Sequence, residues 1–209
     1  MKKEFEKRIL SSVFIIPISL FFVLQGSVFF LFFLGILFLV TSYEWIKMIK
    51  KNQFIKIIGI FFLFFSFYSA YQLRNYLESI VGLNAFLFII LICIFTDIGG
   101  YTFGKIFKGK KLTSISPNKT YAGMIGSFIC SLIICMLFII YFNYSINLII
   151  FTFLISLVSQ SGDLFVSYLK RKADIKDTGK FLPGHGGLLD RLDGIIFAVP
   201  LGIKIFIFF

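Results

Sequence analysis

The acidic residues of this 209-residue chain are few, so their positions indicate where chemistry could take place. The six aspartates fall in two polar segments, at about 104–121 and 169–193, or in the apolar stretches that lead into them: Asp97, Asp163, Asp174, Asp177, Asp190 and Asp193. The four glutamates lie among predicted loop or interfacial residues, where we expect them only to balance charge: Glu4, Glu6, Glu44 and Glu78. The aspartates are therefore the candidate chemical groups.

Asp97 and Asp163 each lie inside an otherwise apolar run. An aspartate near the centre of a membrane helix costs about 2.5–3.5 kcal/mol on insertion scales, and less near the interface. A bound cation would offset that cost, and an ion pair with an interfacial lysine is the simpler alternative. Because acids within membrane segments are functional by default, both aspartates are candidate metal ligands.

Helical spacing predicts a polar stripe that starts at Asp163. Ser167, Lys170 and Asp174 follow it at i+4, i+7 and i+11, which places all four on one helix face. A carboxylate, a hydroxyl and an ammonium on one face suit a metal-bound polyphosphate. Alternatively, the stripe only aligns with other polar groups at the membrane surface.

A glycine-rich stretch follows in the second polar segment. Gly184, Gly186 and Gly187 precede a helix that we expect to begin near Leu188. Backbone amides ahead of a helix N-terminus bind anions, and glycine lets a ligand approach them closely. This pattern predicts a phosphate site.

Asp190 and Asp193 share one face of that helix, at i and i+3. Mg²⁺ takes one or two carboxylates together with substrate phosphates and waters, so Asp163 and Asp190 could supply its two carboxylates from different helices. His185, the only histidine, has no Cys or His neighbour for a zinc site. We expect it to contact phosphate or relay a proton, with a structural bond to the loop backbone as the alternative.

The other polar segment carries a second candidate phosphate loop. Pro117 breaks any preceding helix, and Ser116, Lys119 and Thr120 could cradle phosphates. The glycine spacing of a Walker loop is absent. A basic loop at a membrane can also simply set topology or attract anionic lipid headgroups.

The elements that would position these groups are membrane helices. The chain is 58% hydrophobic and only 15% charged, and its mean hydropathy is +0.95, which leaves too little polar surface for a soluble globule. Seven apolar runs of near-spanning length are visible, at about 9–24, 28–42, 57–71, 80–103, 122–142, 146–168 and 194–209. The first has no small-residue cleavage site after it, so we expect a retained helix paired with the second rather than a signal peptide.

Charge placement predicts the topology. With seven spans, 19 of the 21 Lys and Arg residues fall on one side, and only Arg74 and Lys204 fall elsewhere. The positive-inside rule then places the N-terminus and both polar segments in the cytoplasm. The net charge of +11 is therefore interpreted as loop charge rather than as a nucleic-acid surface. Cys93, Cys130 and Cys135 lie inside apolar runs and are expected to be core residues.

The polar segments resemble the signature of phosphatidate cytidylyltransferases, also called CDP-diacylglycerol synthases. The motifs that carry the resemblance are Ser167-Tyr168-Leu169-Lys170-Arg171, Lys176-Asp177-Thr178-Gly179, and the run from Leu182-Pro183-Gly184-His185-Gly186-Gly187 to Asp190-Arg191-Leu192-Asp193. It extends upstream to Gly162-Asp163-Leu164, to Ser116-Pro117-Asn118-Lys119-Thr120, and to Asp97 through Tyr101 and Gly104. The motifs cover roughly the C-terminal half, and Ala122 stands where the family usually has Glu or Gln.

The resemblance implies an all-α, polytopic transmembrane helix bundle of about seven spans. It would form one integral-membrane domain over 1–209, with N-terminal spans in 1–80 and a catalytic half in 81–209. The implied reaction converts CTP and phosphatidate to CDP-diacylglycerol and pyrophosphate, with Mg²⁺ and an optional second cation. The implied location is the cytoplasmic (inner) membrane of a bacterium, with the active site facing the cytoplasm. The lipid bilayer is a partner, nucleic acid is not, and a homodimer is an open alternative.

The resemblance also implies roles for individual residues. The metal ligands would be Asp163 and Asp190, with Asp97 as a further candidate. The catalytic polar positions would be Lys170, Arg171, Lys176, Asp177, His185, Arg191 and Asp193. The substrate-binding positions would be Ser116, Pro117, Lys119, Thr120, Ser167, Gly186 and Gly187.

Two other functions compete with this interpretation. A CTP-dependent lipid-alcohol kinase would transfer the γ-phosphoryl group and release CDP, and the dense signature match disfavours it. A small ion or phosphate transporter would place polar residues at mid-membrane in several helices. Here the polar residues gather at one face, which disfavours a transporter.

Overall fold

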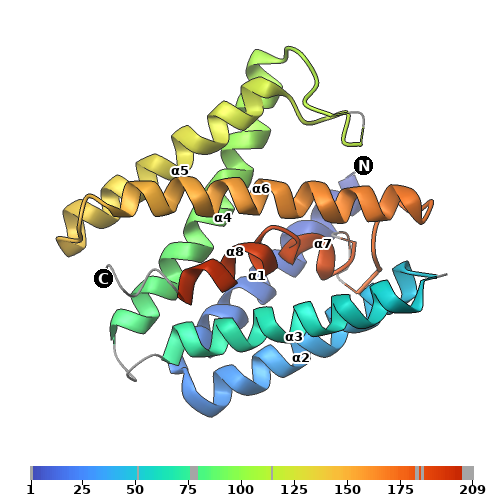
Figure 1. Cartoon of the computed structure of the whole chain (residues 1–209), viewed down its shortest axis with the longest axis horizontal. Coiled ribbons are helices and arrows are strands. Elements are labelled where there is room, and N and C mark those ends of the chain that lie inside the picture. Colours follow the sequence, from blue (N-terminus) through green and yellow to red (C-terminus); the bar gives the residue numbers. More distant parts are fainter. Residues whose placement is uncertain are drawn as a thin grey trace.

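The chain forms a bundle of helices (Figure 1). This computed structural model describes residues 2–50, 52–75, 80–113, 115–181, 184 and 186–203, with side chains from residue 13 onward. Within these ranges the helices are α1 (Lys2–Gln25), α2 (Ser27–Met48), α3 (Gln53–Asn75), α4 (Ile80–Phe107), α5 (Tyr121–Phe142), α6 (Leu148–Lys172), α7 (Leu189–Leu192) and α8 (Ile195–Gly202). The described ranges hold no β-strand beyond one isolated bridge between Lys111 and Thr120. The expected all-α class is confirmed.

Five of the described helices, α2 to α6, are long and apolar enough to cross a membrane. Many of their phenylalanines and isoleucines are exposed, as expected where lipid replaces water as the solvent. The first predicted span lies in α1, whose side chains are described only from Val13 to Gln25, so its full apolar length is not tested. The seventh is described only through α8, because 204–209 lie outside the described residues. The count of seven spans and the cytoplasmic N-terminus therefore stay predictions.

Helix α8 is a short central element that packs against α3, α4 and α6 (Figure 1). Pro200 lies inside α8 and has no N–H to donate to the carbonyl of Ile196, four residues earlier. The Ser66 hydroxyl of α3 donates to that carbonyl at 2.6 Å. A side chain from the N-terminal half thus replaces the hydrogen bond that α8 cannot make itself and ties α8 to α3.

Helices α4 and α5 form the closest pair, and they set the position of the loop between them. A Cβ on Gly99 would lie 2.8 Å from the backbone carbon of Gly126, so both glycines are needed for this approach. The Ser127 hydroxyl of α5 also donates to the carbonyl of Thr96 at 2.7 Å. The two backbones therefore hold the ends of the 108–120 loop in a defined place.

The predicted separation of the first two apolar runs, 9–24 and 28–42, is confirmed by a turn in which Gly26 adopts φ +65°. Arg74, one of the two basic residues outside the charge alternation, is buried against this turn. Its Nε donates to the carbonyl of Val23 at 2.6 Å, and its Nη2 donates to that of Leu24 at 2.9 Å. Arg74 therefore caps α1 rather than setting topology.

We expect an Arg74→Met substitution to destabilise the fold. It leaves two carbonyls at the end of α1 without their donor, and each such loss costs about 1–3 kcal/mol when the group is buried. The thermal midpoint in detergent should fall clearly, and Arg74→Lys, which keeps one donor group, should fall less. Equal midpoints for Arg74→Met and the unmodified chain would contradict this role.

Candidate active site

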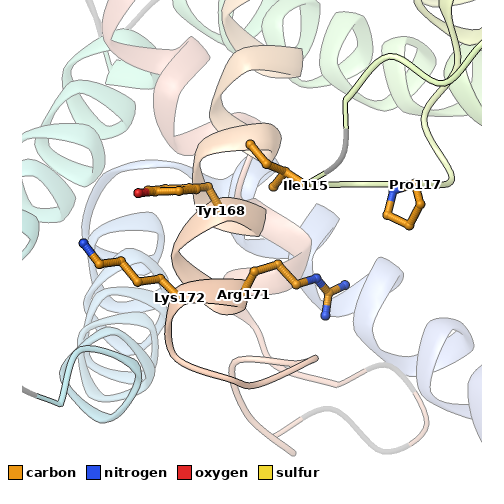
Figure 2. Close-up of a pocket in the computed structure, with 5 residues that line it drawn as sticks. All are labelled: Ile115, Pro117, Tyr168, Arg171 and Lys172. Carbon is orange, nitrogen blue, oxygen red and sulfur yellow. The ribbon is translucent and has the colours of Figure 1, made fainter.

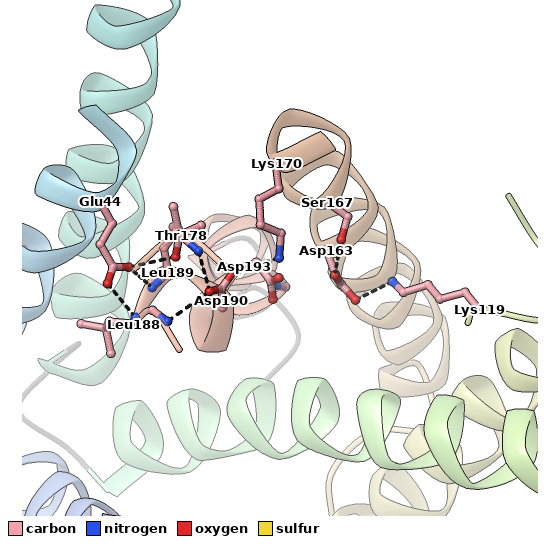
Figure 3. Close-up of polar contacts among 12 residues, drawn as sticks. Glu44, Lys119, Asp163, Ser167, Lys170, Thr178, Leu188, Leu189, Asp190 and Asp193 are labelled. Carbon is pink, nitrogen blue, oxygen red and sulfur yellow. Dashed lines mark hydrogen bonds and ion pairs between the residues drawn. The ribbon is translucent and has the colours of Figure 1, made fainter. Parts of the chain in front are cut away.

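The polar end of α6 brings three of the predicted site residues onto one face (Figure 3). Asp163 accepts a hydrogen bond from the Ser167 hydroxyl at 3.3 Å and forms an ion pair with Lys119 at 2.5 Å. Lys170, two turns along the same helix, contacts Asp190. The prediction that Asp174 continues this stripe is wrong, because α6 ends at Lys172 and Asp174 lies in the following turn at φ +56°.

Asp190 accepts hydrogen bonds from three donors, and both of its carboxylate oxygens take part. Lys170 Nζ donates to Oδ1 at 2.8 Å. The backbone amides of Thr178 and Gly187 donate to Oδ2 at 2.8 Å and 3.1 Å. Only 8% of the Asp190 side chain is exposed. A nearly buried carboxylate thus links the end of α6 to two points of the following segment.

Glu44 of α2 contacts the candidate site, which the sequence analysis did not predict. It is 2% exposed, so the expectation that it merely balances charge is wrong. Its carboxylate accepts from the amide of Leu188 at 3.0 Å, from the amide of Leu189 at 2.8 Å and from the Thr178 hydroxyl at 3.1 Å. The one signal in the sequence was an acid directly after an apolar run.

These contacts correct the predicted anion site ahead of the short helix. The helix begins at Leu189, close to the expected Leu188. However, the amides of Leu188 and Leu189 are taken by Glu44, and that of Gly187 is taken by Asp190. At these three amides the place predicted for a phosphate is therefore occupied by the chain's own carboxylates.

Three aspartates from separate elements share one electrostatic environment. Asp97 of α4 interacts with Asp163, Lys119 and Arg191, and Asp193 interacts with Asp163, Lys170, Asp97 and Lys119. Burial, and then the nearby charge of Asp163, raises the pKa of Asp193 above its usual range. This concentration of negative charge favours a cation.

The carboxylates fit a divalent cation that keeps part of its water shell. Within the described ranges, no three side chains of His, Cys, Asp or Glu converge into an all-protein metal cage. Mg²⁺ needs only one or two carboxylates when substrate phosphates complete its shell. Asp163 and Asp190 meet that requirement in chemistry, and each is now neutralised by a lysine, Lys119 or Lys170. The alternative of a lysine ion pair is therefore observed for Asp163.

The 108–120 loop is a tight turn that presents Lys119 to α6. The amide of Leu112 donates to the carbonyl of Lys119 at 2.8 Å, and the amide of Lys119 donates to that of Ser116 at 3.0 Å. The Thr120 hydroxyl accepts from the amide of Gly123 at 3.1 Å and so caps α5. Thr120 therefore has a structural contact in the loop where a phosphate contact was expected.

An open pocket of about 640 Å³ lies between this loop and the last turns of α6 (Figure 2). Its lining is both basic and apolar: Ile115, Pro117, Tyr168, Arg171 and Lys172. A guanidinium and an ammonium beside an aromatic ring suit a phosphate attached to an apolar body. Two predicted residues, Pro117 and Arg171, thus share this pocket.

The remaining predicted residues lie around this centre or outside the described part. Lys176, Asp177 and Arg191 are exposed on the segment between α6 and α8. Asp177 lies beside Gly186, where a Cβ would come 3.5 Å from the Asp177 Cβ. His185, like Leu182 and Pro183, lies outside the described residues, so its predicted role is not placed.

Comparison with known proteins matches this arrangement to a family. The model of the cytidylyltransferase family matches residues 54–209. A Staphylococcus haemolyticus protein named phosphatidate cytidylyltransferase is 48% identical over 124 residues, which cover 57% of this chain and 48% of the relative. A Staphylococcus saprophyticus protein of the same name is 44% identical over the same shares.

A Rickettsia felis protein of that name is 32% identical over 212 residues, covering 96% of this chain and 91% of the relative. The chain spans about half the length of the two staphylococcal relatives. The family match includes α3 to α8 and every predicted site residue, and Glu44 lies before it. The chain therefore belongs to the cytidylyltransferase family.

Proposed function

We propose that this protein is a phosphatidate cytidylyltransferase that makes CDP-diacylglycerol and pyrophosphate from CTP and phosphatidate. The observation that carries the proposal is the pair of lysine–aspartate contacts, Lys119–Asp163 and Lys170–Asp190, beside a basic pocket. The names of the relatives support the same reaction.

The reaction requires neutralisation of the phosphate charges more than it requires a general base. An oxygen of the phosphatidate phosphate forms a bond to the α-phosphorus of CTP, and the bond from that phosphorus to the β-phosphate oxygen breaks. The nucleophile is already an anion at neutral pH, so no proton has to be removed from it. The barrier comes from bringing two polyanions together and from the charge that develops on pyrophosphate.

The side chains of the site can meet that demand. Lys119 and Lys170 are held in place by ion pairs with Asp163 and Asp190, and their ammonium groups would neutralise phosphates that approach these carboxylates. Arg171 can pair with phosphate through two N–H groups. We propose Asp163 and Asp190 as the residues that would hold Mg²⁺, with Asp97 and Asp193 close enough to add negative potential. Bound Mg²⁺ would supply positive charge to the phosphate oxygens.

The location of the site follows from its polar surroundings. We propose that the ends of α4 and α6 face the cytoplasm in a bacterial inner membrane, since 19 of the 21 basic residues would then lie on that side. Water-borne CTP would meet phosphatidate there, while the acyl chains stay in lipid. A homodimer is the alternative assembly to a monomer, and light scattering of the detergent complex distinguishes them.

The test is a product assay on the purified chain in detergent with CTP, phosphatidate and Mg²⁺. We expect CDP-diacylglycerol and pyrophosphate in equal amounts, loss of both with a chelator, and recovery when Mg²⁺ is restored. CDP release with a phosphorylated lipid alcohol would instead identify a kinase. No turnover with either acceptor would contradict the proposed function.

The basic pocket gives a separate prediction for lipid binding. An Arg171→Gln variant should raise the KM for phosphatidate about tenfold, the effect of losing one charge-assisted phosphate contact. The KM for CTP should change little. Lys180→Gln removes an exposed basic residue that does not line the pocket and serves as the control. Equal KM values for phosphatidate in both variants would remove Arg171 from the lipid site.

A further inference from the structure

A buried carboxylate in the N-terminal half supports the segment that carries Asp190. Glu44 lies on α2, ahead of the 54–209 region that the family model matches, yet the three hydrogen-bond partners it has among the described residues lie 134 to 145 residues away in the chain. All three partners are donors: the amides of Leu188 and Leu189 and the hydroxyl of Thr178. Figure 3 shows Glu44 on one side of the 178–190 turn and Asp190 on the other.

Glu44 and Asp190 accept hydrogen bonds from the same two backbone segments, at Thr178 and at 187–189. Thr178 donates its hydroxyl to Glu44 at 3.1 Å and its amide to Asp190 at 2.8 Å. Gly187 donates its amide to Asp190 at 3.1 Å, and the next two amides donate to Glu44. A shift of the Glu44 carboxylate would therefore move both of the backbone donors that orient Asp190.

Two signature glycines make room for this carboxylate. A Cβ on Gly179 would lie 2.8 Å from the Glu44 Cδ, and a Cβ on Gly187 would lie 2.8 Å from Glu44 Oε2. Both distances are too short for real atoms. The glycines at these positions thus fit the Glu44 carboxylate as well as the turn itself.

We propose that Glu44 is a positioning residue for the cytidylyl-transfer site: it holds the Thr178 and 187–189 backbone so that Asp190 and Lys170 meet in the geometry the reaction uses. This inference rests on the proposed function. Glu44 acts through the loop, because among the described residues its hydrogen bonds reach Thr178, Leu188 and Leu189 rather than the pocket or the Lys119–Asp163 pair.

The main variant is Glu44→Gln, which keeps the size but turns one acceptor into a donor. Its amide group cannot accept from the Leu188 and Leu189 amides and the Thr178 hydroxyl together. We expect kcat to fall about ten- to a hundredfold, as is typical of residues that orient a metal's ligands without contacting the metal themselves. The half-saturating Mg²⁺ concentration should rise, while the KM for phosphatidate should stay the same.

Thr41→Val is the matched control, since Thr41 is buried on the same helix and its hydroxyl donates to the carbonyls of Leu37 and Phe38 in that helix. It should keep wild-type kcat. Thr178→Val removes one donor to Glu44 and leaves its amide free to serve Asp190. Its effect should be smaller than that of Glu44→Gln and should not multiply with it in the double variant.

A second readout does not depend on turnover. Hydrogen exchange at the amides of Leu188 and Leu189 should quicken about tenfold in Glu44→Gln and remain unchanged in Thr41→Val. If the unmodified chain made no CDP-diacylglycerol, the proposed function would fail. Quicker exchange in Glu44→Gln would still support the conclusion that Glu44 stabilises the loop.

Two outcomes would overturn the positioning role. One is unchanged exchange at both amides in Glu44→Gln. The other is a lower thermal midpoint together with wild-type kcat and Mg²⁺ dependence in the folded fraction, which would make Glu44 a stability residue only. If Glu44→Gln does not fold, wild-type kcat and exchange in Thr178→Val would overturn the role instead.

Discussion

An Asp190→Asn variant is expected to lose about a thousandfold in kcat for CDP-diacylglycerol formation, because it would remove one of the two carboxylates proposed to hold Mg²⁺. Asp190 accepts from Lys170 on one oxygen and from two backbone amides on the other. Asparagine has one acceptor oxygen, so either the lysine or the two amides must face an amide group that donates. The substitution therefore loses the charge and one set of contacts together.

The measurement is steady-state kinetics in detergent across a range of Mg²⁺ concentrations. Asp174→Asn is the control, since it makes the same chemical change at an exposed residue that lies past the end of α6. Its φ of +56° is one that asparagine tolerates well. Full activity in Asp174→Asn beside the loss in Asp190→Asn would assign the effect to position. An Asp190→Asn variant with more than a tenth of wild-type kcat would argue against Asp190 as a metal ligand.

Local spacing predicted the parts of the site that lie on one element. Asp163, Ser167 and Lys170 share a face of α6 because i, i+4 and i+7 always do in a helix. The start of α7 near Leu188 was likewise visible from the glycines before it. The same reasoning extended the stripe too far, to Asp174, because the end of α6 depends on how the following residues turn.

Contacts between distant parts of the chain could not be predicted in this way. Glu44 is separated from Leu188 by 144 residues, and nothing in its own neighbourhood indicates which amides it will meet. The short α8 shows the same limit, since its apolar run resembled a span and yet its described part packs inside the bundle through Ser66 and Pro200. The positions of Glu44 and α8 depend on burial and on contacts with distant residues, and hydrophobic periodicity predicts neither of these.

A Gly187→Ala substitution should lower kcat about a hundredfold, because the new methyl group has no space at this turn. Its Cβ would lie 2.7 Å from the Gly179 amide nitrogen and 2.8 Å from Glu44 Oε2. Gly187 does not adopt a positive φ, so the cost arises from crowding rather than from backbone strain. Relieving these contacts requires moving Glu44 or the backbone at 178–179, and the amide of Thr178 in that backbone donates to Asp190.

Gly35→Ala on α2 is the matched control for Gly187→Ala, since nothing lies within 4 Å of the Cβ it would add. Alanine in a helix interior is favoured over glycine by about 0.5–1 kcal/mol, so Gly35→Ala should keep its activity and match or exceed the wild-type thermal midpoint. Kinetics and thermal unfolding of both variants in one detergent make the comparison. If Gly187→Ala retained wild-type kcat, the Glu44 contact could shift without disturbing Asp190, and the tight coupling of the two carboxylates through this turn would be wrong.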